Sequence, residues 1–174
     1  MTTAVLSIGS NLGDSFAHLR AAVRQLGAAV VHVSGVYATP PWGDSAQPPY
    51  LNAVVLTEDP TATARDWLTR AQACEAAGGR VRDPDRRFGP RTLDVDVIAV
   101  WDDGVPVLDD DPELTLPHPR AHLRAFVLVP WHAVRPDAEL PGHGPIAALL
   151  TTPEVAADVA GVTPRPELSL ESME

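Results

Sequence analysis

The sequence contains no lysine, so all 13 of its basic side chains are arginines. They stand against 23 acidic residues, which gives a formal net charge of −10. Such a charge argues against a protein that holds nucleic acid through its phosphates. A GC-rich genome would explain the preference for arginine, but not its distribution. Five of the arginines fall within twelve residues: Arg80, Arg82, Arg86, Arg87 and Arg91.

Cysteine and long apolar runs are also scarce. Cys74 is the single cysteine, so no internal disulfide can form, which is typical of a reducing cytoplasm. No apolar run approaches the roughly 20 residues of a membrane span. The first residues, MTTAVLSIGS, lack the basic start and long apolar stretch of a signal peptide. We therefore expect a cytoplasmic protein that does not contact membranes.

The apolar residues that are present predict one α+β domain. An apolar content of 45% over 174 residues is enough for a core. Six elements follow one another in the order β-α-β-β-α-β, which is the ferredoxin-like arrangement of an antiparallel sheet with helices packed on it. They are a strand at 3–8, a helix begun by Asp14 and ended by Gly27, strands at 28–38 and 51–57, a helix at about 61–77, and the strand that follows Leu93.

The pattern weakens after residue 102. Residues 105–117 predict short edge strands, and residues 119–130 predict a helix. From residue 151 the chain is rich in proline, threonine and glutamate, which favours a loosely ordered segment. We therefore expect a functional domain over 1–150, with extra C-terminal elements, followed by a tail over 151–174.

The stretch FGPRTLDVDVIAVW, residues 88–101, combines an arginine, two aspartates and an apolar strand. Side chains alternate along a strand, so Asp94 and Asp96 point to the same side, about 7 Å apart. Two carboxylates at the mouth of a buried strand repel each other and resist desolvation. A hard divalent cation would neutralise them, and the nearby arginines would suit a polyanion such as a phosphate chain.

Other features have two interpretations each. GSNLGD, residues 9–14, lacks the usual nucleotide-loop spacings and is best interpreted as a tight turn. Gln72 and Glu75 share a helix face, and their spacing alone favours a solvent-exposed face over a site. His118 lies between two prolines in LPHP and could present its imidazole at a fixed position. Tyr50 and Phe126 are either core aromatics or the two sides of a slot for a planar ligand.

Six separated motifs, taken in order, resemble the hydroxymethyl-dihydropterin pyrophosphokinase family of folate biosynthesis. They are IGSNLGD (8–14), YATPPWG (37–43), PYLNAV (49–54), GRVR (79–82), FGPRTLDVDV (88–97) and LPHPR (116–120). The resemblance runs from about residue 4 to residue 150. It implies a monomeric ferredoxin-like enzyme that transfers pyrophosphate from ATP to 6-hydroxymethyl-7,8-dihydropterin and releases AMP.

The resemblance also implies roles for individual residues. Two Mg²⁺ ions would be held by Asp94 and Asp96, with Arg82 and Arg91 on the phosphate oxygens as further catalytic residues. The implied ATP site consists of Gln72, Glu75, Arg82, Phe88, Arg91, Ile98, His118 and Arg124. The implied pterin site consists of Thr39, Pro40, Trp42, Tyr50, Asn52 and Phe126.

Two alternatives remain open at this stage. Another Mg²⁺-dependent nucleotide-using transferase could carry an Asp-x-Asp site, but would not need the pocket of Tyr50, Asn52 and Phe126. A ferredoxin-like module that binds a small ligand without turnover would not need clustered arginines in front of two aspartates. The products formed from ATP and the pterin distinguish the three possibilities.

Overall fold

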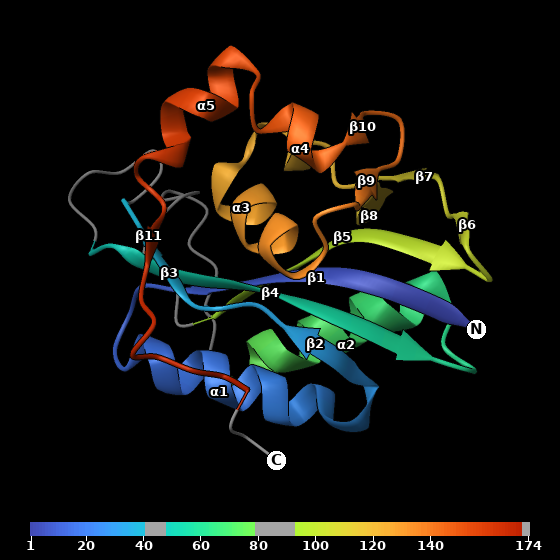
Figure 1. Ribbon diagram of the computed structural model, residues 1–174. Helices are drawn as coiled ribbons and strands as arrows, with labels where there is room; N and C mark the ends of the chain where they lie inside the picture. Colours follow the sequence, from blue (N-terminus) through green and yellow to red (C-terminus); the bar gives the residue numbers. More distant parts are fainter. Residues whose placement is uncertain (41–47, 79–92, 172–174) are drawn as a thin grey trace.

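The computed structural model of the chain describes residues 1–40, 48–78 and 93–171. Its main feature is a seven-stranded sheet in the order β11-β3-β4-β1-β5-β6, with β2 also paired to β4 (Figure 1). The strands of this sheet are β1 (Thr2–Ser10), β2 (Val30–Val33), β3 (Tyr37–Thr39), β4 (Tyr50–Asp59), β5 (Asp94–Asp102), β6 (Val105–Pro106) and β11 (Thr163–Pro164). The central strand β1 lies between β4 and β5 and is antiparallel to both, which confirms the predicted ferredoxin-like fold class.

Two long helices, α1 (Ser15–Leu26) and α2 (Ala64–Ala77), cover one face of this sheet (Figure 1). As predicted, Asp14 caps α1, and its side chain accepts a hydrogen bond from the Ala17 amide at 3.1 Å. A capping box between Thr63 and Asp66 begins α2. Buried side chains on both helices, such as Leu19 and Trp67, pack against Leu6 and Val55 of the sheet.

The opposite face of the sheet carries a second core. Its helices are α3 (Ala125–Val134), α4 (Ile146–Leu149) and α5 (Pro153–Val159), and Figure 1 shows α3 lying across the strands with α4 and α5 beyond it. Leu128 and Trp131 of α3 pack here against Val54 and Ile98. These helices cover most of this face, and a cleft remains at one end of it.

The predicted strand over 28–38 is divided in two. The short helix η1 (Gly27–Ala29) precedes β2, and residues 34–36 separate β2 from β3. At the break, the Ser34 hydroxyl accepts a hydrogen bond from the Val54 amide at 2.8 Å, and the Ser34 amide donates to the Val54 carbonyl at 2.9 Å. The serine side chain thus replaces one bond of the regular ladder, and strand propensity alone does not reveal such a replacement.

The alternation of side chains along β5 changes at Ile98. Asp94 and Asp96 lie on the same side of the strand, as predicted, and Ile98 follows them on the side of the second core, whereas Val95 and Val97 face the first. A register shift between Val5 and Leu6 of β1 leaves Ile98 as the extra residue of a β-bulge. Beyond it Val100 packs in the first core and Trp101 beside the second, the reverse of the strict alternation that was predicted.

The residues after β5 form several short elements. The predicted edge strands are β6, β7 (Asp109–Asp111) and β8 (Leu114–Leu116), and β9 (Glu139–Leu140) pairs with β10 (Gly144–Pro145). The helix expected over 119–130 begins later. The turn η2 (Ala121–Leu123) precedes α3, which continues through Pro130 to Val134.

The segment after residue 150 is more ordered than its composition indicates. It forms α5 and β11, and β11 pairs with β3 in the main sheet. Val155 and Leu170 are buried, with exposed fractions of 0% and 2%. The expectation of a loosely ordered tail is corrected here, because single apolar residues spaced along this polar stretch fix it to both cores.

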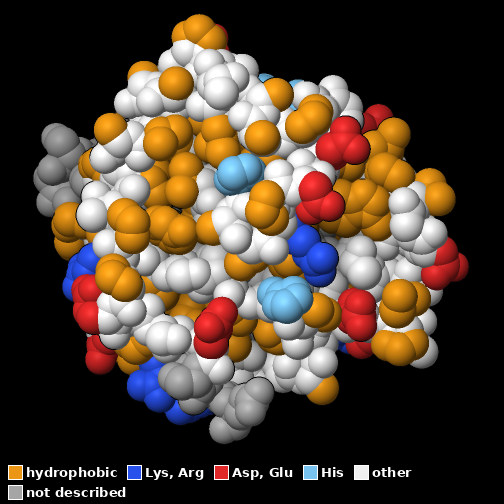
Figure 2. Space-filling model, viewed as in Figure 1, with side chains coloured by type: hydrophobic (Ala, Val, Ile, Leu, Met, Phe, Trp, Pro, Cys, Tyr) orange, Lys and Arg blue, Asp and Glu red, His pale blue; other side chains and the backbone are white. Residues whose placement is uncertain are grey.

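The surface in Figure 2 mixes apolar, acidic and uncharged atoms over the face seen in Figure 1, and the few basic side chains on it lie apart from one another. Within the described part of the chain, no helix is both long and apolar enough to cross a membrane.

Candidate active site

A cleft of about 840 Å³ opens at the uncovered end of the second sheet face. Four neighbouring strands form its floor, and the loop before α3, the start of α3 and the α5 segment form its walls. Its lining residues are Ser7, Gly9, Thr39, Pro40, Tyr50, Asn52, Asp94, Asp96, His118, Pro119, Arg120, Leu123, Arg124, Ala125, Phe126, Ala157, Asp158, Gly161 and Val162.

One end of the cleft is charged. Asp94 and Asp96 reach it from β5, and Arg124 reaches it from the residue before α3. Nη1 of Arg124 lies 3.6 Å from Oδ2 of Asp96, and the two side chains are 18% and 31% exposed. This arrangement provides carboxylate oxygens for a cation and a guanidinium for an anion at the same place.

His118 lies at the charged end in the neutral form. Burial and, after it, the nearby Arg124 and Arg120 charges lower the pKa of its imidazole to about 4, although Asp94 acts in the opposite direction. Its Nδ1 accepts a hydrogen bond from the Arg120 amide at 3.2 Å. The neutral ring therefore carries its proton on Nε2, which makes Nε2 a hydrogen-bond donor.

This lowered pKa predicts an acid-dependent loss of stability. Between the ordinary pKa of 6.5 and about 4, the unfolded chain binds a proton at His118 that the folded chain does not. The free energy of unfolding should therefore fall as the pH drops through this window. In His118→Asn the free energy of unfolding should fall less steeply over the same window. Urea titrations at several pH values, without Mg²⁺ or nucleotide, measure the slope. The exposed His32 provides the control, and an unchanged slope in His118→Asn would contradict the assignment.

The other end of the cleft is uncharged along its floor. Nδ2 of Asn52 donates to Oγ1 of Thr39 at 2.7 Å, and both residues are buried. Oδ1 of Asn52 lies directly over Gly9, because a Cβ added to Gly9 would be only 2.7 Å from it. The Thr39 hydrogen bond thus fixes the orientation of the Asn52 amide, whose oxygen can accept a hydrogen bond.

Two aromatic rings line the cleft together with the Asn52 amide. Tyr50 begins β4 and Phe126 lies in the first turn of α3, and both line the cleft. The guanidinium carbon of Arg124 lies 5.5 Å from the centre of the Phe126 ring. Arg124 thus connects the aromatic end to the charged end, because it contacts both Phe126 and Asp96.

Comparison with known proteins gives the same picture. The model of the family described as 7,8-dihydro-6-hydroxymethylpterin-pyrophosphokinase (HPPK) matches residues 5–136. The chain belongs to the HPPK family. Curated relatives named 2-amino-4-hydroxy-6-hydroxymethyldihydropteridine pyrophosphokinase include those of Mycobacterium bovis and Mycobacterium tuberculosis, each 47% identical over 99% of this chain and 95% of the relative. That of Mycobacterium leprae is 56% identical over 80% of this chain and 75% of the relative.

Solved structures titled HPPK-DHPS share the fold. One has a TM-score of 0.60 at 9% identity and covers 85% of this chain. Another, from Plasmodium falciparum, has a TM-score of 0.60 at 11% identity over the same share. The chain spans 42% and 44% of the length of these two structures.

Several residues implied by the resemblance to HPPK lie in the cleft, and others do not. Thr39, Pro40, Tyr50, Asn52, Asp94, Asp96, His118, Arg124 and Phe126 line it. Trp42, Arg82, Phe88 and Arg91 lie outside the described residues.

The remaining three implied ATP-site residues are described but are not part of the cleft lining. Gln72 is exposed on α2. Glu75 is buried, and its carboxylate accepts a hydrogen bond from the Val95 amide at 3.0 Å. The Ile98 side chain is buried in the second core, and its carbonyl accepts a hydrogen bond from the His118 amide at 2.8 Å. Ile98 thus fixes the backbone of His118.

Some residues that line the cleft were not predicted from the sequence. Gly9 was interpreted as part of a turn, although it belongs to β1, and its missing side chain makes room for Asn52. Arg120 lies in the LPHPR motif but was given no role. Ala157, Asp158, Gly161 and Val162 lie in the segment expected to be loosely ordered, and no pattern in the sequence indicated them.

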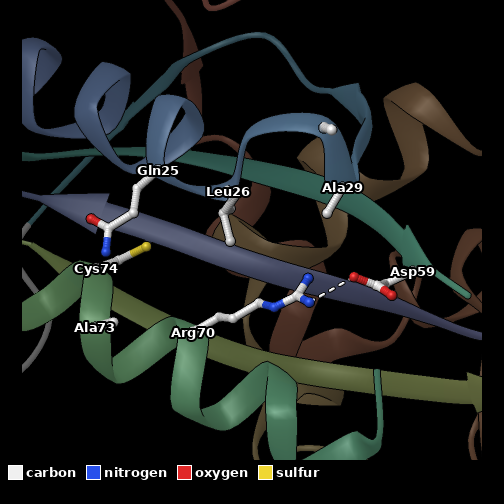
Figure 3. Close-up of a pocket in the computed structure, with 8 residues that line it drawn as sticks. Gln25, Leu26, Ala29, Asp59, Arg70, Ala73 and Cys74 are labelled. Atoms are coloured by element: carbon white, nitrogen blue, oxygen red, sulfur yellow. Dashed lines mark hydrogen bonds and ion pairs between the residues drawn. The ribbon is translucent and has the colours of Figure 1, made fainter. Parts of the chain in front are cut away.

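A second hollow, of about 340 Å³, lies on the side of the sheet that α1 and α2 cover (Figure 3). Arg70, which lines this hollow, already has partners. Its Nη2 lies 2.6 Å from Oδ2 of Asp59, and its guanidinium lies over the Trp67 ring. The Arg70 hydrogen bond lowers the pKa of Asp59 to about 2, assisted by the Thr61 amide. Arg70 is therefore already neutralised by Asp59 in this hollow, and the larger cleft is the candidate active site.

HPPK enzymes generally use Mg²⁺ with ATP, and the charged end of the cleft suits this ion. Its two aspartates supply oxygen ligands, which Mg²⁺ prefers. No group of three or more His, Cys, Asp or Glu that could hold a metal occurs among residues 1–40, 48–78 and 93–171. Mg²⁺ commonly takes one or two carboxylates and completes its shell with phosphate oxygens and water, so Asp94 and Asp96 fit it as a partner of ATP.

Proposed function

We propose that this chain transfers the pyrophosphoryl group of ATP to the hydroxymethyl oxygen of 6-hydroxymethyl-7,8-dihydropterin, and that it does so in the cleft described above. This reaction is the activity of the HPPK family and a step of folate biosynthesis. The observation that carries the location is the two-ended cleft, in which a charged end and an aromatic amide end share one floor.

The charged end binds the phosphates in this proposal. Asp94 and Asp96 hold Mg²⁺, which when bound neutralises and orients the phosphate chain of ATP. Arg124 and Arg120 add positive charge beside the aspartates. His118, neutral at pH 7 with its proton on Nε2, donates a hydrogen bond to an anion without the cost of carrying its own charge.

The aromatic end binds the pterin. The flat ring lies between Tyr50 and Phe126, where stacking favours a planar ligand. Oδ1 of Asn52, fixed by its bond to Thr39, accepts a hydrogen bond from an N–H group at the ring edge. A pterin held in this way directs its hydroxymethyl group along the floor toward β5.

The reaction itself requires positioning more than covalent help. The hydroxymethyl oxygen attacks the β-phosphorus of ATP in line, the bond between the β-phosphorus and the α-phosphate oxygen breaks, and AMP leaves with the electron pair. The attacking hydroxyl loses its proton to the surrounding water.

Further assignments in this proposal follow from the resemblance. Arg82 and Arg91 hold phosphate oxygens, Phe88 covers the nucleotide and Trp42 borders the pterin. Gln72, Glu75 and Ile98 contact the nucleotide from α2 and β5. Residues 1–150 form the pyrophosphokinase domain, and the active unit is a monomer.

Product analysis tests the proposal. The chain is incubated with ATP, Mg²⁺ and 6-hydroxymethyl-7,8-dihydropterin, and the products are identified by mass. AMP and the pterin diphosphate are expected in equal amounts. ADP, or a nucleotide attached to the pterin, would indicate a different transferase, and unchanged substrates would indicate a binding module.

Tyr50→Ala and Phe126→Ala should each weaken pterin binding while changing ATP binding little. Aromatic stacking contributes roughly 0.5–1.5 kcal/mol beyond area burial, so a loss of about tenfold in pterin affinity is expected. Calorimetry with each ligand separately measures it. Phe16→Ala is a matched control, because Phe16 is also a partly buried phenylalanine with an arginine over its ring, but on α1. Equal losses for both ligands would mean that Tyr50 and Phe126 serve only as core residues.

A further inference from the structure

The uncharged end of the cleft is closed by a segment beyond the family match. The HPPK model matches residues 5–136, whereas Ala157 and Asp158 on α5, followed by Gly161 and Val162, line the same cleft as Asn52 and Asp94. The relative from Mycobacterium bovis aligns over 99% of this chain, so it has a corresponding segment.

This segment is fixed from both sides of the sheet. Val155 and Val162 are buried in the second core, with exposed fractions of 0% and 8%. After them β11 pairs with β3, and the Arg165 amide donates to the Val36 carbonyl at 2.8 Å. Leu170 is then buried in the first core. Figure 1 shows the chain passing beside β3 and on toward α1. Residues 157–162, which we call the wall, therefore have a defined position in the cleft.

The wall touches the residues that hold the Asn52 amide. A Cβ added to Gly161 would lie 3.4 Å from Cδ of Pro40, so the backbone of the segment packs directly on that proline. Pro40 follows Thr39, whose hydroxyl accepts the Asn52 hydrogen bond. The segment thus bounds the uncharged end, away from the aspartates of β5.

The wall differs in charge from the other end of the cleft. Asp158 is exposed and brings a carboxylate to the cleft, whereas at the end near β5 the carboxylates of Asp94 and Asp96 lie beside Arg120 and Arg124. A carboxylate repels phosphates and accepts hydrogen bonds from ring N–H groups. The cleft therefore favours a phosphate chain at one end and an uncharged heterocycle with N–H donors at the other.

We propose that residues 157–162 are a specificity element for the pterin substrate. They limit the length of the ring slot through Ala157 and Val162, and they keep phosphates out of it through Asp158. This inference rests on the proposed function, because it assigns the pterin to the uncharged end.

Two pairs of variants test it without removing a core residue. Ala157→Phe adds bulk on the cleft side of α5, and Ala156→Phe adds the same bulk at an exposed alanine outside the cleft lining. Asp158→Ala removes the carboxylate of the wall, and Glu154→Ala removes an exposed carboxylate from the first turn of the same helix. Melting temperatures confirm that each variant is folded.

Steady-state rates are measured with the pterin varied at saturating ATP, and with ATP varied at saturating pterin. Ala157→Phe should raise KM for the pterin at least about tenfold and change KM for ATP less than about twofold. Asp158→Ala should raise KM for the pterin about threefold and strengthen inhibition by excess ATP, because phosphates then enter the slot. Both controls should match the unmodified chain.

Unchanged KM values in Ala157→Phe, equal changes for both substrates, or the same changes in the Ala156→Phe control would each overturn the proposal. Failure of the proposed function gives a different result, because the unmodified chain would then form no pterin diphosphate. In that case calorimetry with the pterin alone takes the place of kinetics. Loss of pterin binding in Ala157→Phe but not in Ala156→Phe would still support a role of residues 157–162 in pterin binding. Absence of pterin binding by the unmodified chain would refute that role.

Discussion

Asp94→Asn and Asp96→Asn are each expected to lower turnover by about 100-fold or more while leaving the fold intact. Each change removes a negatively charged oxygen ligand from the proposed Mg²⁺ site, where charge neutralisation supplies much of the catalysis. Turnover of ATP and the pterin at saturating Mg²⁺ measures the loss. Asp102→Asn is the matched control, because Asp102 ends the same strand and its side chain is 63% exposed next to the N-terminus.

Both variants should keep a melting temperature close to that of the unmodified chain without Mg²⁺. Each relieves the repulsion between the two carboxylates, which favours the folded state. In Asp96→Asn this gain is partly offset by a weaker contact with Arg124, which lies 3.6 Å from Asp96. Near-normal turnover in both variants would refute the metal assignment.

Gly9→Ala is expected to weaken pterin binding about tenfold or more with little change for ATP. The added Cβ would lie 2.7 Å from Oδ1 of Asn52, closer than any real contact, so the amide must move. Its hydrogen bond to Thr39 is then strained or broken, and a buried polar group without its partner costs about 1–3 kcal/mol. Calorimetry with the pterin and with ATP, each alone, measures the difference.

Gly35→Ala is the control for this prediction. Gly35 lies in the break between β2 and β3, and a Cβ there would meet only Tyr37 Cε1, at 3.9 Å. It should therefore bind the pterin as the unmodified chain does. Retention of full pterin affinity by Gly9→Ala would show that Asn52 does not contact the ligand.

Much of the fold could be predicted because its patterns are local. The spacing of Leu19, Val23 and Leu26 and the Asp14 cap define α1, and apolar runs define β1 and β4. Asp94 and Asp96 were correctly predicted to share one side of β5 because alternation is strict up to Ile98. The family motifs added Tyr50, Asn52 and Phe126, which the structure brings together in one cleft.

The features that were missed depend on contacts between distant residues. The bulge at Ile98 arises from the pairing of β5 with β1, and the sequence of β5 alone does not indicate it. Gly9 gains its role only from Asn52, which lies on another strand. The segment after residue 150 is ordered by a few buried side chains and by pairing with β3, and its own composition indicates the opposite.

The pairing of β11 with β3 also affects how the protein behaves at high concentration. Without β11, the outer side of β3 would present unpaired backbone groups, which is where one sheet can add strands from another molecule and begin to aggregate. The strand that covers it is only two residues long and ends in Pro164, which has no amide hydrogen to offer a further strand. By covering β3, β11 thus disfavours edge-to-edge pairing of the sheet with another copy of the chain.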